Sequence, residues 1–191
     1  MTGQVEATQK VRSMHPQKFA MWLFLVSVTM FFGSYISAYM VQKGAKDLFL
    51  TGLPTLLLYT TIIILLSSVS MQYAYISAKR NNIGKIKVSL LITLVLGILF
   101  TVGQFMAWRE LVDAGVHFVN SNPLESFIYI FTGLHLAHLF AAVIFLIAVL
   151  GKAYNYQVHS KSLVRLEMCA TFWHFLGGLW LCLYLFLNYY S

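Results

Sequence analysis

The most constraining feature of this sequence is an apolar run over residues 124–150 that carries histidines near its middle. A helix of this length exceeds the roughly 20 residues that are needed to cross a hydrocarbon core. Thr132, His135 and His138 would therefore lie at membrane depth, where polar side chains turn away from lipid and toward protein. The run predicts a bundle in which other helices cover this polar stripe.

Four further apolar runs are long enough to span a membrane. The five spans are predicted at about residues 19–41, 54–78, 86–108, 124–150 and 166–189. Hydrophobic residues make up 59% of the chain and charged residues only 10%, which excludes an ordinary soluble domain. We predict an all-α integral membrane protein, with one five-helix domain over residues 19–191 and a cytoplasmic N-terminal segment over residues 1–18.

The basic residues indicate how the chain is oriented in the membrane. Of the 13 Lys and Arg residues, only Lys43, Lys46 and Arg109 lie in the first and third loops. Cytoplasmic loops carry an excess of Lys and Arg, so the N-terminus is predicted in the cytoplasm and the C-terminus outside. The charges form no patch interleaved with stacking aromatics, and nucleic-acid binding is not expected.

Carboxylates and prolines are placed unfavourably for a stand-alone transporter. No Asp, Glu, Lys or Arg lies well inside a predicted span, and Glu167 lies within the first turn of the last one. The prolines Pro16, Pro54 and Pro123 lie outside the spans or at their starts, so no span is broken as transporter sites require. Both a proton relay within this chain and a lone transporter are therefore disfavoured.

The polar groups inside the spans form a predicted structural cluster: Gln104, Thr132, His135, His138, Glu167, Trp173 and His174. Helix geometry would let His138 and His174 meet across a helix pair, as ligands of a b-type haem or as proton carriers. We favour neutral histidines that hydrogen-bond neighbouring helices. His135 and His138 would then face the last span, Glu167 and His174 would face the fourth, and no catalytic, cofactor-binding or metal-binding residue is expected.

Several of these residues stand in a familiar pattern. Residues 132–138, T-G-L-H-L-A-H, resemble the T-G-x-H-x-x-H helix of subunit III of haem–copper terminal oxidases, the cytochrome c oxidase and quinol oxidase group. The last span is similar to that family's E-x5-W-H-F-x4-W-x3-Y segment, from Glu167 to Tyr184. Residues 67–74 match its S-G-V-S-x-x-W-A stretch, and Gln104 with Trp108 resembles the end of its next helix. The resemblance covers all five spans and favours the five-helix form common in bacteria.

The resemblance implies an accessory subunit of a proton-pumping oxygen reductase in the bacterial cytoplasmic (inner) membrane. Such a subunit packs on the catalytic subunit I, supports stability and turnover, and leaves haem and copper to partner subunits, with room for bound phospholipid. Where the family often has carboxylates, this chain has Val28, Ala107 and Gly177. Two alternatives are an accessory subunit of a related nitric oxide reductase and an independent b-haem electron carrier.

Overall fold

The computed structural model describes residues 16–46, 55–80, 82–115, 123–154 and 160–190. These residues form helices and turns and no strand. The helices are α1 (Pro16–Lys46), α2 (Leu56–Lys79), α3 (Ile83–Asp113), α4 (Pro123–Tyr154) and α5 (Ser160–Tyr190). Each contains a stretch long and apolar enough to cross a membrane, which confirms the predicted all-α protein with five spans.

The helices extend beyond the predicted spans because apolarity marks only the part of a helix that lies in hydrocarbon. The third span, for example, is predicted at 86–108, whereas α3 begins at Ile83 and ends at Asp113. Residues 1–15 of the predicted N-terminal segment lie outside the described residues, and the remainder of that segment, from Pro16, already belongs to α1. The second span is predicted from residue 54, also outside them; α2 is described from Leu56.

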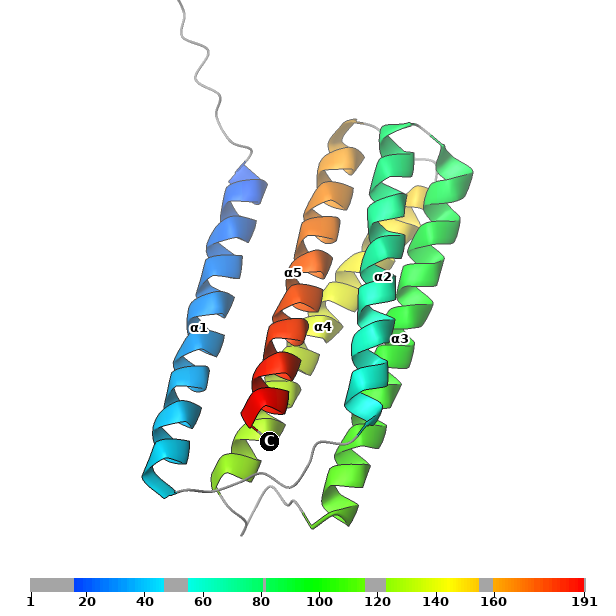
Figure 1. The fold of residues 1–191 in the computed structure, drawn as a ribbon. Helices are drawn as coiled ribbons and strands as arrows, with labels where there is room; N and C mark the ends of the chain where they lie inside the picture. Colours follow the sequence, from blue (N-terminus) through cyan, green and yellow to red (C-terminus); the bar gives the residue numbers. More distant parts are fainter. Residues whose placement is uncertain (1–15, 47–54, 81, 116–122, 155–159, 191) are drawn as a thin grey trace, which may run out of the picture.

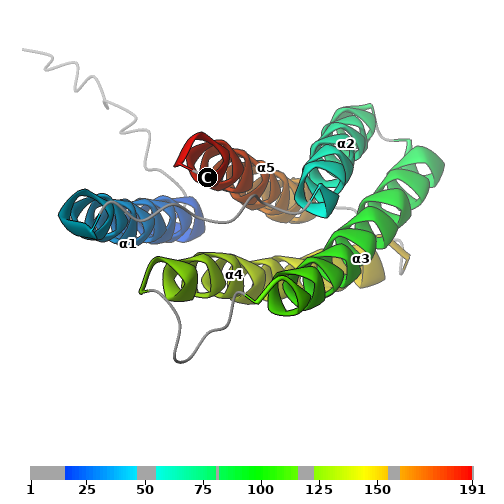
Figure 2. The same ribbon diagram turned by 60° about the horizontal axis from the view of Figure 1, so that its bottom comes forward.

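The five helices form a bundle in which α1 stands at one edge (Figures 1 and 2). The chain turns tightly from α2 to α3, and these two helices pack closely along their length. α5 packs against α2 and α4, α4 also contacts α3, and α1 contacts only α4 and α5. The start of α1, the α2–α3 turn, the end of α4 and the start of α5 lie at one end of the bundle (Figure 1).

Large side chains fill the interior in two clusters. The larger cluster joins α2, α3, α4 and α5 around Phe100, Trp173 and Trp180. The smaller cluster, with Phe32 and Phe131, joins α1 to α4 and α5. The outer surface is also apolar, as contact with lipid requires, and carries exposed Trp22, Met30, Val69 and Ile144 among others. Interior and exterior are thus distinguished by packing and small polar groups rather than by hydrophobicity.

Candidate functional site

Two indoles of α5 hydrogen-bond hydroxyl groups of α2. Trp173 Nε1 donates to Ser67 Oγ at 3.0 Å, and Trp180 Nε1 donates to Thr61 Oγ1 at the same distance. All four side chains are buried. The two bonds are separated along α5 by seven residues, or about 10 Å, and together they fix both the spacing and the register of the α2–α5 pair.

A third indole makes the same kind of contact between α3 and α4. Trp108 Nε1 donates to Thr132 Oγ1 at 2.9 Å, which connects two of the motifs that the sequence singles out. Thr132 in turn donates to the Ile128 carbonyl at 2.8 Å, one turn earlier on its own helix. A hydroxyl can accept and donate at once, so this threonine is satisfied in both roles without water.

The same arrangement recurs at the α2 acceptors. Ser67 donates to the Ile64 carbonyl at 2.8 Å, and Thr61 donates to the Leu57 carbonyl at 2.7 Å. Small hydroxyl residues inside a membrane helix thus donate a hydrogen bond to a carbonyl of their own helix and accept one from the neighbouring helix. Each indole–hydroxyl pair therefore places no unpaired polar group in the bundle.

The α2–α3 pair has its own polar contacts. Gln104 Nε2 donates to Thr60 Oγ1 at 3.1 Å, and Ser70 Oγ donates to the Ser89 carbonyl at 3.0 Å. The two backbones approach closely at Gly103, where an added Cβ would lie 2.5 Å from the Thr60 methyl carbon. Gln104 thus joins α3 to α2.

His135 lies at the centre of the bundle and is only 1% exposed. Its ring is packed between Phe100 of α3, with a centroid distance of 6.1 Å, and Trp180 of α5, at 5.0 Å. The predicted contact with the last helix is present, but it is a ring contact. Within the part of the chain that the structure describes, neither ring nitrogen has a hydrogen-bond partner. This imidazole therefore fills space and makes no hydrogen-bonded connection between helices.

His138 does not take the direction that the sequence predicts. Its ring packs against Phe24 and Phe32 of α1, at centroid distances of 6.2 and 6.0 Å, rather than against the last helix. Its Nδ1 lies 2.7 Å from the Leu134 carbonyl of its own helix. Side chains three residues apart on a helix point about 60° apart. His138 therefore points toward α1, whereas His135 points into the centre of the bundle.

The prediction that Glu167 and His174 face the fourth helix is also wrong. Glu167 Oε2 lies 2.7 Å from Lys18 Nζ of α1, and His174 Nε2 lies 3.1 Å from Gln72 Oε1 of α2. Because α5 lies between α1 and α2 as well as against α4, its polar side chains have other partners. His138 and His174 are directed to different helices, so the structure does not bring together the pair that a b-type haem would need.

The predicted cluster is therefore not one cluster. Gln104, Thr132, His135 and Trp173 lie in the bundle interior, whereas His138, Glu167 and His174 lie where α1 or α2 meets the rest. Sequence analysis singled out Ser67 within a motif but did not identify it as a hydrogen-bond partner, and it missed Thr60, Thr61, Gln72 and the cation Lys18 as partners. The signal for the hydroxyls is their spacing at 60, 61 and 67 on one buried face of α2. Among the described residues, no group of three or more His, Cys, Asp or Glu side chains is placed to hold a metal ion.

The fold and these contacts define a polytopic α-helical membrane protein whose interior polar groups bind helix to helix. The cytochrome c oxidase subunit III family matches residues 2–191, and the chain belongs to that family. It is 26% identical to the cytochrome bo(3) ubiquinol oxidase subunit 3 of Buchnera aphidicola (88% of this chain, 90% of the relative). It is 27% identical to the corresponding subunit of Pseudomonas aeruginosa (87% and 81%) and 29% identical to cytochrome c oxidase subunit 3 of Petromyzon marinus (88% and 67%).

The chain is therefore an accessory subunit of a haem–copper oxygen reductase and a member of a terminal oxidase complex. Its five spanning helices and bacterial relatives make it a multi-pass protein of the bacterial inner membrane. α5 also approaches α2 closely at Gly177, where an added Cβ would lie 2.9 Å from Ser68 Oγ.

Proposed function

We propose that this subunit packs directly on the catalytic subunit I, supports the stability and turnover of the complex, and carries no redox centre of its own. Haem and copper belong to the partner subunits in this proposal. The observation that carries it is the hydrogen bond between His174 and Gln72, which lies at the surface of the isolated chain, although both residues are inside predicted spans. Polar side chains at such depth are costly in lipid, so this face requires a protein cover.

A groove beside this pair indicates that the partner subunit covers the same face of the chain. It has a volume of about 460 Å³ and lies between α1 and α5. Small or polar residues line it at positions Thr29, Gly33, His174, Gly178 and Cys182. Small residues let a partner helix approach the backbone closely. Close packing of this kind drives helix association in a membrane, because the hydrophobic effect does not favour contact with protein over contact with lipid. His174 belongs to both features, so the groove and the polar pair make one continuous surface.

The proposed orientation has the N-terminus in the cytoplasm and the C-terminus outside. The ion pair of Lys18 with Glu167 supports it, because it places the start of α1 beside the start of α5, at the end of the bundle that also carries the basic α2–α3 turn. In a chain whose Cys169 and Cys182 are replaced, Asp113→Cys should react with an impermeant maleimide in intact spheroplasts. Arg80→Cys should react only after the membrane is opened.

The test of the proposal is purification of the tagged chain in mild detergent, followed by identification of what accompanies it. The oxygen-reducing catalytic subunit is expected to accompany the chain, and its absence would contradict direct packing on subunit I. His174→Leu and Gln72→Leu should each reduce the catalytic subunit recovered, while the haem spectrum of the recovered complex stays unchanged. Tyr59→Leu, at an exposed position on α2, is the matched control and should have no effect. Unreduced recovery in both polar variants, or altered haem absorption, would contradict the proposal.

A further inference from the structure

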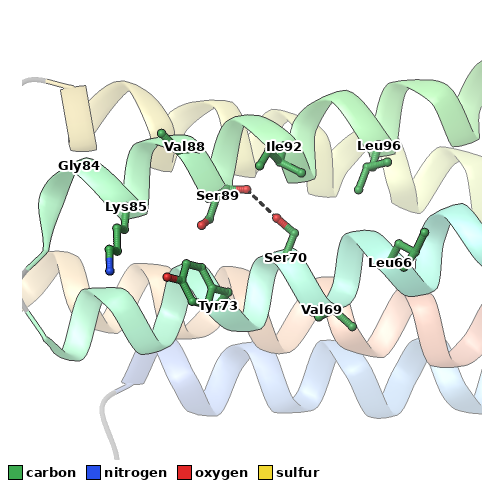
Figure 3. A pocket seen from close by; sticks show the side chains of 10 residues that line it. All are labelled: Leu66, Val69, Ser70, Tyr73, Gly84, Lys85, Val88, Ser89, Ile92 and Leu96. Atoms are coloured by element: carbon green, nitrogen blue, oxygen red, sulfur yellow. Dashed lines mark hydrogen bonds between the residues drawn. The ribbon is translucent and has the colours of Figure 1, made fainter.

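A groove on the lipid-facing surface lies between α2 and α3, near the end where one helix turns into the other (Figure 3). Its volume of about 620 Å³ falls within the range of about 300–1,000 Å³ in which ligands bind. We name it the α2–α3 groove and define it by its lining: Leu66, Val69, Ser70, Tyr73, Gly84, Lys85, Val88, Ser89, Ile92 and Leu96.

Most of this groove is apolar and needs no water. Leu66 of α2 faces Leu96 and Ile92 of α3 across it, and Val69 and Val88 lie at its outer edges, which gives an apolar channel along the helices (Figure 3). The two serines on its floor are joined, because the Ser70 hydroxyl donates to the Ser89 carbonyl at 3.0 Å. From Lys85 to Leu96 the channel extends roughly 16 Å along α3, in the direction that an acyl chain takes in a bilayer.

One end of the groove is polar and cationic. The Lys85 side chain extends from α3 toward α2, and the Tyr73 hydroxyl points to the same end (Figure 3). The neighbouring cations are engaged elsewhere: Lys79 Nζ lies 4.6 Å from the centroid of the Tyr75 ring, and Lys87 Nζ lies 4.8 Å from that of Tyr154. Among the described residues, no carboxylate is paired with Lys85. Its charge is therefore available to a ligand in the groove.

The start of α3 adds further donors at this end. Gly84, in the first turn, lines the groove, and an added Cβ there would meet nothing closer than an Asn82 oxygen at 4.0 Å. Asn82 precedes the helix and makes no side-chain capping hydrogen bond. First-turn amides without a cap are natural donors to phosphate oxygens, and the helix dipole favours a negative charge there.

We propose that the α2–α3 groove is a binding site for one anionic phospholipid. The phosphate is held by the Lys85 ammonium, the Tyr73 hydroxyl and the first-turn amides of α3. One acyl chain lies along the apolar channel between Leu66 and Ile92. The polar end and the apolar channel lie in the order, from membrane surface to interior, that a phospholipid presents, and the charge of Lys85 selects an anionic headgroup over a zwitterionic one. The site does not depend on which subunit covers the His174 face.

The test removes phospholipid from the purified complex by exhaustive detergent washing and then adds back phosphatidylglycerol or phosphatidylcholine. The amount of each lipid that stays bound is measured. The wild-type complex should retain phosphatidylglycerol preferentially, and Lys85→Gln should reduce that preference about fivefold, the effect of one lysine near an anionic headgroup. Lys152→Gln is the matched control, because Lys152 is also exposed at the end of its helix but lies outside the groove. Equal loss in both variants, no loss in Lys85→Gln, or equal wild-type affinity for the two lipids would overturn the proposal.

A second pair of variants tests the channel itself. Val88→Phe fills the groove and should abolish retention of the bound lipid, whereas Val95→Phe, at an exposed position of α3 outside the groove, should leave it unchanged. A photoreactive group introduced at Val69 distinguishes the occupant. Cross-linking to phosphatidylglycerol supports the proposal, and cross-linking to another subunit, or retained lipid in Val88→Phe, overturns it.

Discussion

The indole Nε1 of Trp173 lies 3.0 Å from the Oγ of Ser67, and this contact joins positions that are 106 residues apart in the chain. Lipid chains are as apolar as leucine side chains, so hydrophobicity alone does not hold one membrane helix against another. An indole offers a large packing surface and one donor, and a serine offers a small surface and an acceptor. The pair therefore lets α5 approach α2 closely and fixes its rotation.

Ser67→Ala removes the acceptor of this hydrogen bond and changes the side-chain volume very little. The Trp173 Nε1 donor is then buried without its partner, so we expect the free energy of unfolding in mixed micelles to fall by about 1 kcal/mol. Ser34→Ala is the matched control, because the Ser34 hydroxyl is exposed and donates to the Phe31 carbonyl of its own helix, as Ser67 donates to the Ile64 carbonyl. An equal effect of the two substitutions would show that the bond within the helix, not the bond between helices, is being measured.

Gly103→Ala tests the close approach of α2 and α3. The new Cβ would lie 2.5 Å from the Thr60 methyl carbon, and Thr60 cannot simply rotate away. Its Oγ1 donates to the Leu57 carbonyl and accepts a hydrogen bond from Gln104. Overpacking of this kind costs about 1–3 kcal/mol, which should be seen as a lower free energy of unfolding.

The control for this substitution is Gly151→Ala, where an added Cβ meets nothing within 4 Å. There the greater helix propensity of alanine should raise stability by about 0.4–1 kcal/mol. Thr60→Ser removes the obstructing methyl group and keeps the hydroxyl, so the double variant Gly103→Ala/Thr60→Ser should recover most of the loss. A double variant no more stable than Gly103→Ala alone would place the strain elsewhere.

The helices themselves can be predicted from the sequence because a membrane span is defined by length and apolarity. The start of α4 at Pro123 agrees with this, since proline fits the first helical position. The family could also be predicted, because residues 132–138 and the last span carry spaced polar groups in an otherwise apolar background. Both inferences need only local sequence.

The partners of the polar groups could not be predicted in the same way. In a soluble bundle the hydrophobic stripe of each helix shows which side faces inward. Here the outward side is equally apolar, as the exposed Ile144 and the buried Leu146 of α4 illustrate. Apolarity therefore does not indicate the rotation of each helix or the order of its neighbours, and the helices predicted to face His138 and His174 differ from those that the two side chains contact. Those directions depend on how five helices pack together.

His135→Leu distinguishes the two roles of histidine in this bundle. Its ring nitrogens have no hydrogen-bond partner among the described residues, and burying a polar group in that condition costs about 1–3 kcal/mol. Leucine has a similar volume and needs no partner, so the free energy of unfolding should stay the same or rise. His174→Leu should instead lower the stability of the complex, since it removes the bond to Gln72. A clear loss for His135→Leu would show that another molecule hydrogen-bonds this ring.

The ion pair of Lys18 with Glu167 connects α1, the helix at the edge of the bundle, to the start of α5. The two side chains are 30% and 41% exposed, so water and salt screen them and the pair contributes about 0.2–1 kcal/mol. Lys18→Glu and Glu167→Lys should each lower the free energy of unfolding by more than this, because each replaces an attraction with a repulsion. The exchanged double variant should recover the loss, and the single effects should shrink as ionic strength rises. Lys152→Glu is the control for a change of net charge alone at the same end of the bundle. If the exchange fails to restore stability, the contact between α1 and α5 depends on the lysine stem and its packing rather than on charge.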